Sequence, residues 1–286
     1  MRATQSCVVS ASASDLNEGG QQSSSDDMNV SLHFFALLFG MTSMGCAQLK
    51  AGTTATYQPS VVSYYPHQTG SYTATASERQ DVGVPQSGSL NNPSRLEPNP
   101  YCTVRQATNY GTRQTVETLQ KALVIVHNRH RGTPKVHVGD ISGPKGGPLP
   151  GHRSHQNGRD VDIGYYLNRG HDSARFRAAT PETIDRARTW TLIQALIAQG
   201  NIQYIFMDHD LQRAIYTYAE HIIQLPKQTL TALFSFPHGR AARRGLIRHW
   251  QGHIDHMHVR LLPPFKNTSS SLNADDHAHR YRRYLH

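Results

Sequence analysis

Apolar positions along the chain recur at two spacings, one typical of helices and one typical of strands. Residues 113–131 predict a helix, because apolar residues recur there every three or four positions and a Gly-Thr-Pro sequence ends the run. The side chains expected to face the core are Val116, Leu119, Leu123 and Val126. A short strand is expected directly afterwards, over the sequence KVHVGDI.

Two further helices are predicted in the second half of the chain. Thr180-Pro181-Glu182 predicts the start of one, since Thr can cap a helix, Pro suits its first position and Glu offsets its dipole, and Gly200 predicts its end. A strand over IQYIFM follows, and then a third helix from about residue 211 to 225. The inward residues are expected to be Ile184, Trp190, Ile193 and Ile197 in the first of these helices, and Leu211, Ile215 and Ile222 in the second.

The order of these elements predicts the fold class. Helices and strands alternate irregularly, and the strands are short and mixed in character. This favours a small α+β domain, in which an antiparallel sheet is flanked by helices, over a doubly wound parallel sheet.

The first hundred residues differ in composition from the rest. Residues 48–100 are rich in Thr, Ser, Gln, Gly and Pro, which favours a tether or loosely packed arm. Edge strands are the alternative, because Tyr and Val recur there. The apolar stretch from Phe34 to Met41 is too short to span a bilayer and resembles the core of a secretory signal. We therefore hypothesise that translation starts at Met28 and that residues 1–47 comprise a spurious extension and a signal sequence.

Two cleavage schemes fit the end of this signal. Ser43-Met44-Gly45-Cys46 resembles a lipoprotein signal, in which Cys46 would carry a lipid anchor for the outer membrane, whereas Gly45-Cys46-Ala47 would suit an ordinary signal peptidase. A buried helix of a cytoplasmic protein is a third alternative, although no amphipathic period accompanies the apolar run.

Composition and charge narrow the function classes. Of 286 residues, 37% are hydrophobic, which excludes a disordered chain and a protein of many membrane spans. The formal net charge is +9, and because residues 1–60 carry two basic and four acidic side chains, the rest carries +11. Such a surface attracts nucleic acid, anionic lipid or acidic wall polymers. The three cysteines form no Cys-x-x-Cys pair, which argues against a sulfur-ligated zinc site, whereas histidine is abundant, with 18 residues.

Two segments concentrate the residues that can carry chemistry, GHRSHQNGRDVDIG over 151–164 and GHIDHMHVRL over 252–261. In a strand, His256, His258 and Arg260 share one face and the apolar residues between them share the other. Asp160 and Asp162 alternate with Val161 and Ile163 in the same way, and a loop through Gly158 would let His155 turn back toward Asp162. The pattern predicts two neighbouring strands that direct imidazoles and carboxylates into one space.

Two imidazole nitrogens and one carboxylate oxygen suit a catalytic zinc ion, because three protein ligands leave a fourth position for water. Zinc can lower the pKa of its water to about 7 and polarise a carbonyl, and a nearby histidine can move the proton from the attacking water to the leaving amine. The chemistry indicated is amide hydrolysis. The alternatives are a strand with a polar face and solvated aspartates.

These two segments resemble the signatures of penicillin-insensitive murein endopeptidases, which are related to lysostaphin-type and D-Ala-D-Ala metallopeptidases with the pattern His-(six residues)-Asp and His-x-His. The resemblance covers about residues 101–265 and implies a periplasmic zinc (Zn2+) endopeptidase that cuts peptidoglycan cross-links of the D-alanyl to meso-diaminopimelyl type. By position, the implied zinc ligands are His155, Asp162 and His258, with His152 in or beside the site as a further candidate. His256 is implied as general base or transition-state stabiliser, supported by His253.

The resulting organisation is an N-terminal extension with signal over 1–47, an arm over 48–100, a zinc metallopeptidase domain over 101–265 and a basic tail over 266–286. No oxyanion donor is identified, although Arg153 and Arg260 are available, and His171-Asp172 is only a faint candidate for a second metal site. Two other functions stay open: a non-catalytic peptidoglycan-binding module and a D,D-carboxypeptidase of the same superfamily.

Other motifs are weaker. Residues 139–147 superficially resemble a phosphate-binding loop but lack its Gly-Lys-Ser/Thr ending, so a rigid turn is expected there. No His-Glu-x-x-His helix and no Gly-x-Ser-x-Gly elbow occurs in the sequence. A nucleic-acid patch is less expected than a solvated or wall-facing surface, because aromatic residues do not interleave with the basic ones. These basic residues are Lys227, Arg240, Arg243, Arg244 and Arg248. Nucleic acid is therefore not the expected partner, and the family resemblance implies cross-linked peptidoglycan peptide instead.

Overall fold

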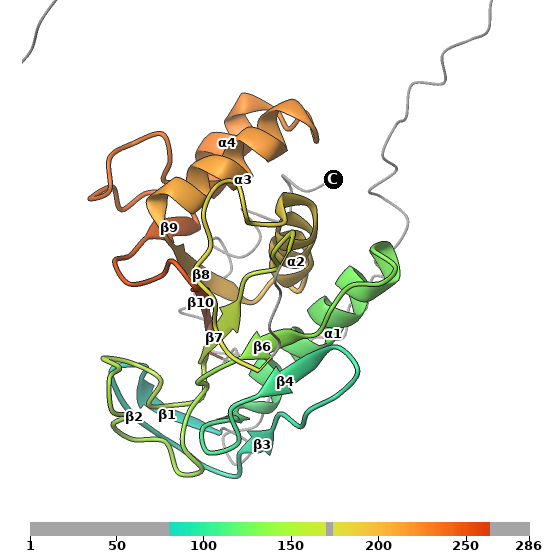
Figure 1. The fold of residues 1–286 in the computed structure, drawn as a ribbon. Helices are drawn as coiled ribbons and strands as arrows, with labels where there is room; N and C mark the ends of the chain where they lie inside the picture. The colour runs from blue at the N-terminus through green and yellow to red at the C-terminus, as the bar shows by residue number, and fades with distance from the viewer. Residues whose placement is uncertain (1–79, 170–173, 264–286) are drawn as a thin grey trace, which may run out of the picture. The chain divides into compact units, whose positions relative to one another are not determined.

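A six-stranded sheet organises the residues that the computed structural model describes, 80–169 and 174–263 (Figure 1). The strand order is β4-β6-β7-β10-β8-β9. The bounds are Cys102–Val104 for β4, Val136–Val138 for β6, Asp160–Gly164 for β7, His256–Leu261 for β10, Ile202–Met207 for β8 and Ile247–His249 for β9. The four inner strands are antiparallel neighbours, and the outer pairs β4–β6 and β8–β9 are parallel. The predicted α+β class with an antiparallel sheet is confirmed, whereas the two parallel outer pairs were not predicted.

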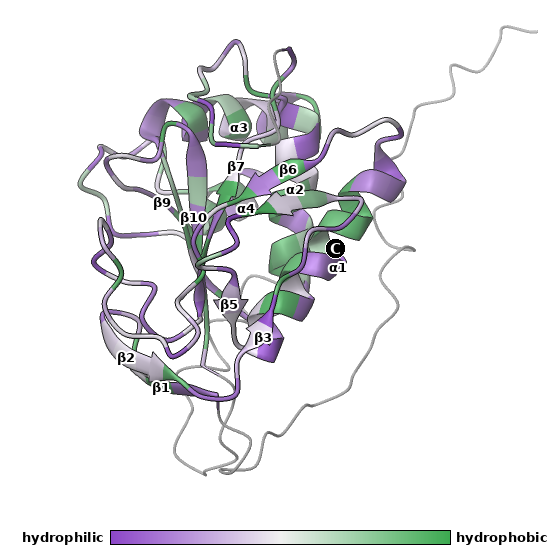
Figure 2. Cartoon of the chain, turned by 60° about the horizontal axis from the view of Figure 1, so that its bottom comes forward, coloured by the Kyte–Doolittle hydropathy of each residue, from purple (hydrophilic) through white to green (hydrophobic). Residues whose placement is uncertain are grey.

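Four helices accompany the sheet in the described part of the chain. They are α1 (Arg113–Arg129), α2 (Arg186–Ala198), α3 (His209–His221) and α4 (Lys227–Leu233). Helix α1 begins where predicted, because the Thr112 side chain accepts a hydrogen bond from the Thr115 amide. All four of its predicted inward residues are buried. Figure 2 shows hydrophobic and hydrophilic residues alternating around this helix, as expected for one that covers a core.

Alternation along the strands gives the sheet two unlike faces. Val161 and Ile163 of β7, together with Met257 and Val259 of β10, belong to one buried hydrophobic core that also contains Leu119 of α1 and residues of α2 and α3. The residues between them carry the acidic and imidazole side chains of the two sequence signatures. One face of the sheet therefore packs against helices, and the opposite face is available for chemistry.

Helix α2 begins five residues later than predicted, at Arg186 instead of Pro181. The Thr180 hydroxyl does accept hydrogen bonds, 3.3 Å from the amides of both Glu182 and Thr183, but these close only an isolated turn. Ile184 then forms a β-bridge with Leu167, which interrupts any helix. The cap that starts α2 is Asp185, whose carboxylate accepts a hydrogen bond from the Arg188 amide. The four predicted inward residues of this segment are nevertheless all buried.

The third predicted helix corresponds to α3, which ends at His221, four residues earlier than predicted. A turn at residues 222–226 follows, and then α4, which was not predicted. Leu211 and Ile215 are buried as predicted, but the prediction for Ile222 is wrong, since this residue is 66% exposed. Ile222 is the C-terminal cap of α3, so the helical periodicity that would turn it inward has already ended.

The described end of the predicted arm packs into the domain. Strands β1 (Asp81–Val84) and β2 (Ser87–Leu90) form a hairpin, and β3 (Ser94–Arg95) pairs with β5 (Tyr110–Gly111). Leu90 and Leu96 are buried. Residues 80–100 therefore follow the strand alternative and not the tether.

The predictions for the signal, for Cys46, for the remainder of the arm and for the tail from residue 266 fall on residues outside the described ranges. Within the described ranges, none of the helices has both the length and the hydropathy that crossing a bilayer requires.

We expect two isoleucines of α3 to differ sharply in their contribution to stability. Ile215→Ala should lower the free energy of unfolding by about 2–5 kcal/mol, because it leaves a cavity in the core. Ile222→Ala should change it by less than about 0.5 kcal/mol, because that side chain is largely in water. Chemical denaturation of both variants measures the difference, and equal losses would contradict this packing of α3.

Candidate metal centre

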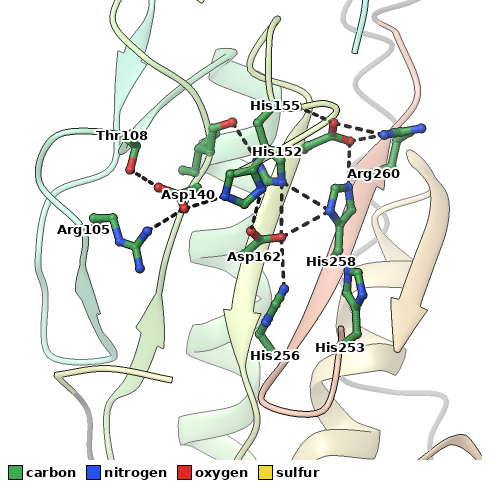
Figure 3. Close-up of polar contacts among 12 residues, drawn as sticks. Arg105, Thr108, Asp140, His152, His155, Asp162, His253, His256, His258 and Arg260 are labelled. Carbon is green, nitrogen blue, oxygen red and sulfur yellow. Dashed lines mark hydrogen bonds and ion pairs between the residues drawn. The ribbon is translucent and has the colours of Figure 1, made fainter. Parts of the chain in front are cut away.

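The pairing of β7 with β10 brings the two sequence signatures together. In their antiparallel register, Asp162 lies opposite His258 and Asp160 lies opposite Arg260. Paired residues point to the same side of a sheet, so all four side chains occupy the face that does not pack against helices. Figure 3 shows Asp162, His258 and Arg260 there. The distance from Asp162 Oδ1 to His258 Nδ1 is 3.2 Å.

His155 reaches this point from the loop before β7. Its φ of 67° lies in the left-handed region, and Gly158, with φ of 73°, completes the turn back toward the strand. His155 Nε2 lies 3.3 Å from Asp162 Oδ1 and 3.3 Å from His258 Nδ1. The other ring nitrogen, Nδ1, donates to the carbonyl oxygen of Ile141 at 3.1 Å, so in the neutral ring the lone pair lies on Nε2, the nitrogen near Asp162.

His152 lies beside His155 and nearest to the other carboxylate oxygen of Asp162, Oδ2. Its Nδ1 lies 3.8 Å from Asp162 Oδ2, and its Nε2 lies 2.9 Å from Asp140 Oδ2. One potential ligand atom from each of His152, His155 and Asp162 can be chosen so that all lie within 4.8 Å of one another. The structure thus brings together all four residues predicted as metal ligands.

The donor set fits a divalent metal ion. Asp162 is 1% exposed, and its Oδ1 has no hydrogen-bond partner of good geometry among the described residues, although two imidazole nitrogens lie within 3.3 Å. A buried carboxylate oxygen without a hydrogen bond is costly unless a cation satisfies it. Imidazole nitrogens with a carboxylate oxygen are ligands that suit zinc and other first-row transition metals.

Two further carboxylates hold the candidate ligands in place. Asp160 Oδ1 lies 3.1 Å from His258 Nε2, and the same carboxylate accepts hydrogen bonds from Arg260 Nε at 2.7 Å and from the His155 amide at 3.0 Å. A carboxylate at the outer nitrogen of an imidazole fixes the orientation of the ring and directs the other nitrogen at the metal.

Asp140 does the same for His152. Besides the contact with His152, its carboxylate accepts hydrogen bonds from Thr108 and, at 2.7 Å, from Arg105 (Figure 3). Asp140 and its two additional partners were missed by sequence reasoning. The only available signal was Asp140 itself, within the segment interpreted as a rigid turn.

The charges in this cluster shift each other's pKa values. Burial raises the pKa of the Asp160 and Asp162 carboxyls, but the charge and contacts of the neighbouring histidines more than offset burial, with Arg260 adding to the effect at Asp160. Both pKa values therefore lie well below the ordinary range. Burial lowers the pKa of His258, yet the two aspartates outweigh burial and raise it to about 9. The positive charge of protonated His258 thus compensates the two carboxylates, as a bound metal ion would.

The two predicted catalytic histidines lie beside the cluster. His256 Nε2 is 3.8 Å from Asp162 Oδ1, and His256 Nδ1 is 2.6 Å from Asp255 Oδ1. The Phe176 ring stacks on the His256 ring with centroids 4.7 Å apart, which limits rotation of the imidazole. The His253 ring centre lies 4.8 Å from that of His256. Burial, together with the charges of its two neighbouring histidines, lowers the pKa of His253 to about 4.

The other candidates are placed as follows. Arg260 is bound to Asp160, so its guanidinium is committed to the support of the cluster, and Arg153 is exposed. His171 and Asp172 lie outside the described residues. Asp255 and Phe176, which orient His256, were not predicted, because their roles depend on contacts that no spacing in the sequence reveals.

Comparison with known proteins identifies one family. The family model described as penicillin-insensitive murein endopeptidase matches residues 82–278, well over half of the 286 residues. The matched range contains the four candidate metal ligands and all the residues described above that contact them. No curated protein matches the chain.

With zinc as the divalent-metal probe, Asp160→Asn should weaken binding to this cluster by about 10- to 100-fold, because the neutral amide orients His258 less firmly. Competition with a chromogenic chelator measures the affinity. Asp210→Asn is the matched control, since Asp210 is exposed and pairs with Arg240. Equal affinities of the two variants would contradict the supporting role of Asp160.

The metal-free protein should lose stability as the pH rises from 6.5 to above 9. The folded-state pKa of His258, about 9, exceeds the ordinary value of 6.5, so its stabilising charge is fully present below pH 6.5 and is lost as the pH passes 9. The loss should be on the order of 3 kcal/mol. Chemical denaturation with chelator present tests this, and His258→Gln should remove most of the dependence. Stability that stays level or rises with pH in the unaltered protein would refute the assignment.

Proposed function

The chain belongs to the penicillin-insensitive murein endopeptidase family, and we propose that it is a zinc-dependent hydrolase of peptide cross-links in peptidoglycan. Family membership makes it a murein endopeptidase, a peptidase whose substrate is peptidoglycan. The zinc dependence rests on one observation, the convergence of three imidazoles on the buried carboxylate of Asp162.

His155, Asp162 and His258 would hold the zinc ion, and His152 is the candidate fourth protein ligand. When bound, zinc would lower the pKa of a water molecule to about 7 and polarise the carbonyl of the scissile bond. The chain contributes the orientation of the ligands. Asp140 and Asp160 set the imidazole rings of His152 and His258, and the Ile141 carbonyl sets that of His155.

His256 is the proposed general base. Asp255 Oδ1 accepts a hydrogen bond from His256 Nδ1 at 2.6 Å, so in the neutral ring the lone pair lies on Nε2, which is 3.8 Å from Asp162 Oδ1. From there Nε2 can take a proton from the attacking water and pass it to the leaving amine, as hydrolysis of an amide requires. Phe176 holds the ring by stacking, and His253 stays neutral beside it at physiological pH because its pKa is about 4.

The bond that we propose as substrate joins D-alanine to meso-diaminopimelic acid. The proposal extends to location, with export to the periplasm directed by the apolar segment after Met28. Lipidation of Cys46 and simple cleavage of the signal remain two alternatives for how the mature protein begins.

His256→Ala should retain zinc but lower the rate of cross-link cleavage by about 10²- to 10⁴-fold, because His256 moves a proton and binds no metal. His221→Ala is the control, since that imidazole is 67% exposed at the end of α3. Zinc content and cleavage of purified cross-linked muropeptides are measured together for both variants. Cleavage by His256→Ala at the rate of the control would remove His256 from the mechanism.

The same digest separates the competing functions. Chelator should stop cleavage, added zinc should restore it, and penicillin should have no effect because no serine nucleophile takes part. Cleavage of cross-linked dimers supports the endopeptidase. Release of terminal D-alanine from monomeric pentapeptides alone would indicate a D,D-carboxypeptidase. Bound zinc with no cleavage of either substrate would indicate a non-catalytic wall-binding module.

A further inference from the structure

The sheet face that carries the candidate metal centre continues past it onto β8 and β9. His258 of β10 lies opposite Phe206 of β8, and Arg260 lies opposite Tyr204. Phe206 in turn lies opposite Arg248 of β9. Because residues paired across strands share a face, Tyr204, Phe206 and Arg248 lie on the same side as the ligands, away from the helices.

Aromatic and guanidinium groups contact one another along this extension. The Phe206 ring centre lies 5.5 Å from that of His258 and 5.7 Å from that of Trp250. The Arg248 guanidinium lies over the Tyr204 ring at 3.9 Å, and that of Arg243 lies 5.7 Å from the Trp250 ring. We call these five residues the aromatic–arginine face: Tyr204, Phe206, Arg243, Arg248 and Trp250.

Arg243 and Arg248 of this face form no ion pair with an acidic residue in the described part of the chain. Neighbouring Arg240, in contrast, pairs with Asp208 and Asp210. Arg248 donates its Nε proton to the Gly245 carbonyl oxygen at 2.9 Å, which leaves its terminal amino groups as donors. Trp250 is 45% exposed beside them. Unpaired guanidinium groups next to an exposed aromatic ring are suited to bind a carboxylate attached to a partly apolar chain.

We propose that the aromatic–arginine face is the subsite that binds the acidic stem peptide on one side of the scissile bond, with Arg248 and Arg243 binding its carboxylates and Trp250 contacting its aliphatic groups. This inference rests on the proposed function, because it takes peptidoglycan peptide as the ligand. The contact between Phe206 and His258 makes the face continuous with the candidate metal centre.

The distance from the candidate metal centre to Arg248 fits the length of a short extended peptide. Strand β9 is two positions from β10 in the sheet, which corresponds to about 10 Å at the usual spacing of strands. An extended peptide covers that distance with about three residues. A carboxylate a few residues from the scissile bond would therefore reach Arg248. A basic protein can also attract nucleic acid, so the experiment compares binding of a single-stranded oligonucleotide with binding of the peptide.

The test measures binding to the full chain in the presence of chelator, so that zinc contributes nothing. Two probes are titrated by calorimetry: a stem tetrapeptide with free carboxylates, and the same peptide with its side carboxylates amidated. The free form should bind about tenfold more tightly, as loss of a charge-assisted hydrogen bond predicts. Arg248→Gln should abolish most of this preference and Arg243→Gln should reduce it. Arg213→Gln, at an exposed position of α3, should preserve it.

Equal binding of the two peptides by the unaltered protein would overturn the inference. It would be overturned as well if Arg248→Gln and Arg243→Gln kept the full preference, or if a single-stranded oligonucleotide bound this face more tightly than the free peptide. Because the Arg243 side chain is exposed, Arg243→Gln should fold normally, and it tests the inference even if Arg248→Gln fails to fold. Digestion of muropeptides is measured in parallel. If the protein digests them but does not prefer the free peptide, only the subsite proposal is refuted. If it prefers the free peptide but does not digest muropeptides, the proposed hydrolase function is refuted and a peptide-binding surface is left.

Discussion

The register between β7 and β10 is the constraint on which the rest of this structure depends. It sets Asp162 opposite His258 and Asp160 opposite Arg260, and it leaves Val161 and Ile163 facing the helices. A shift of one residue would turn the carboxylates into the hydrophobic core and the apolar side chains to the site, so both the packing and the chemistry select the same register. The core under the sheet and the cluster above it are therefore two consequences of one strand pairing.

Burial of two aspartates in such a small space is unfavourable unless positive charge accompanies them. Asp160 is 0% and Asp162 is 1% exposed, and in the described structure His258 and Arg260 supply the compensation. His258 contacts both carboxylates, through Nε2 to Asp160 and through Nδ1 to Asp162. A metal ion at Nδ1 would replace the proton there and keep Asp160 at Nε2, so the cluster can exchange one cation for another without rebuilding its outer contacts.

Much of the fold and the inner part of the site follow from local patterns in the sequence, and the rest depends on contacts between distant segments. Helix α1 and strand β8 agree with prediction because their periodicity is strong and their ends are marked. The Thr180 signal predicted the start of a helix, which is wrong: Thr180 closes an isolated turn, and the β-bridge of Ile184 interrupts any helix there. The ligand candidates were found through their spacing within two segments, whereas Asp140 and Phe176 belong to other loops. Composition predicted a tether over residues 80–100, but Leu90 and Leu96 are buried there, and their burial depends on contacts with distant segments that composition does not reveal.

The central claim is that histidines and an aspartate from two neighbouring segments bind one zinc ion. The most direct measurement is X-ray absorption at the zinc edge of the full chain loaded with one equivalent of the metal. The account predicts a shell of nitrogen and oxygen at about 2.0–2.2 Å with the scattering pattern of at least two imidazole rings. A sulfur shell at about 2.3 Å, or a shell of oxygen alone without imidazole scattering, would contradict it.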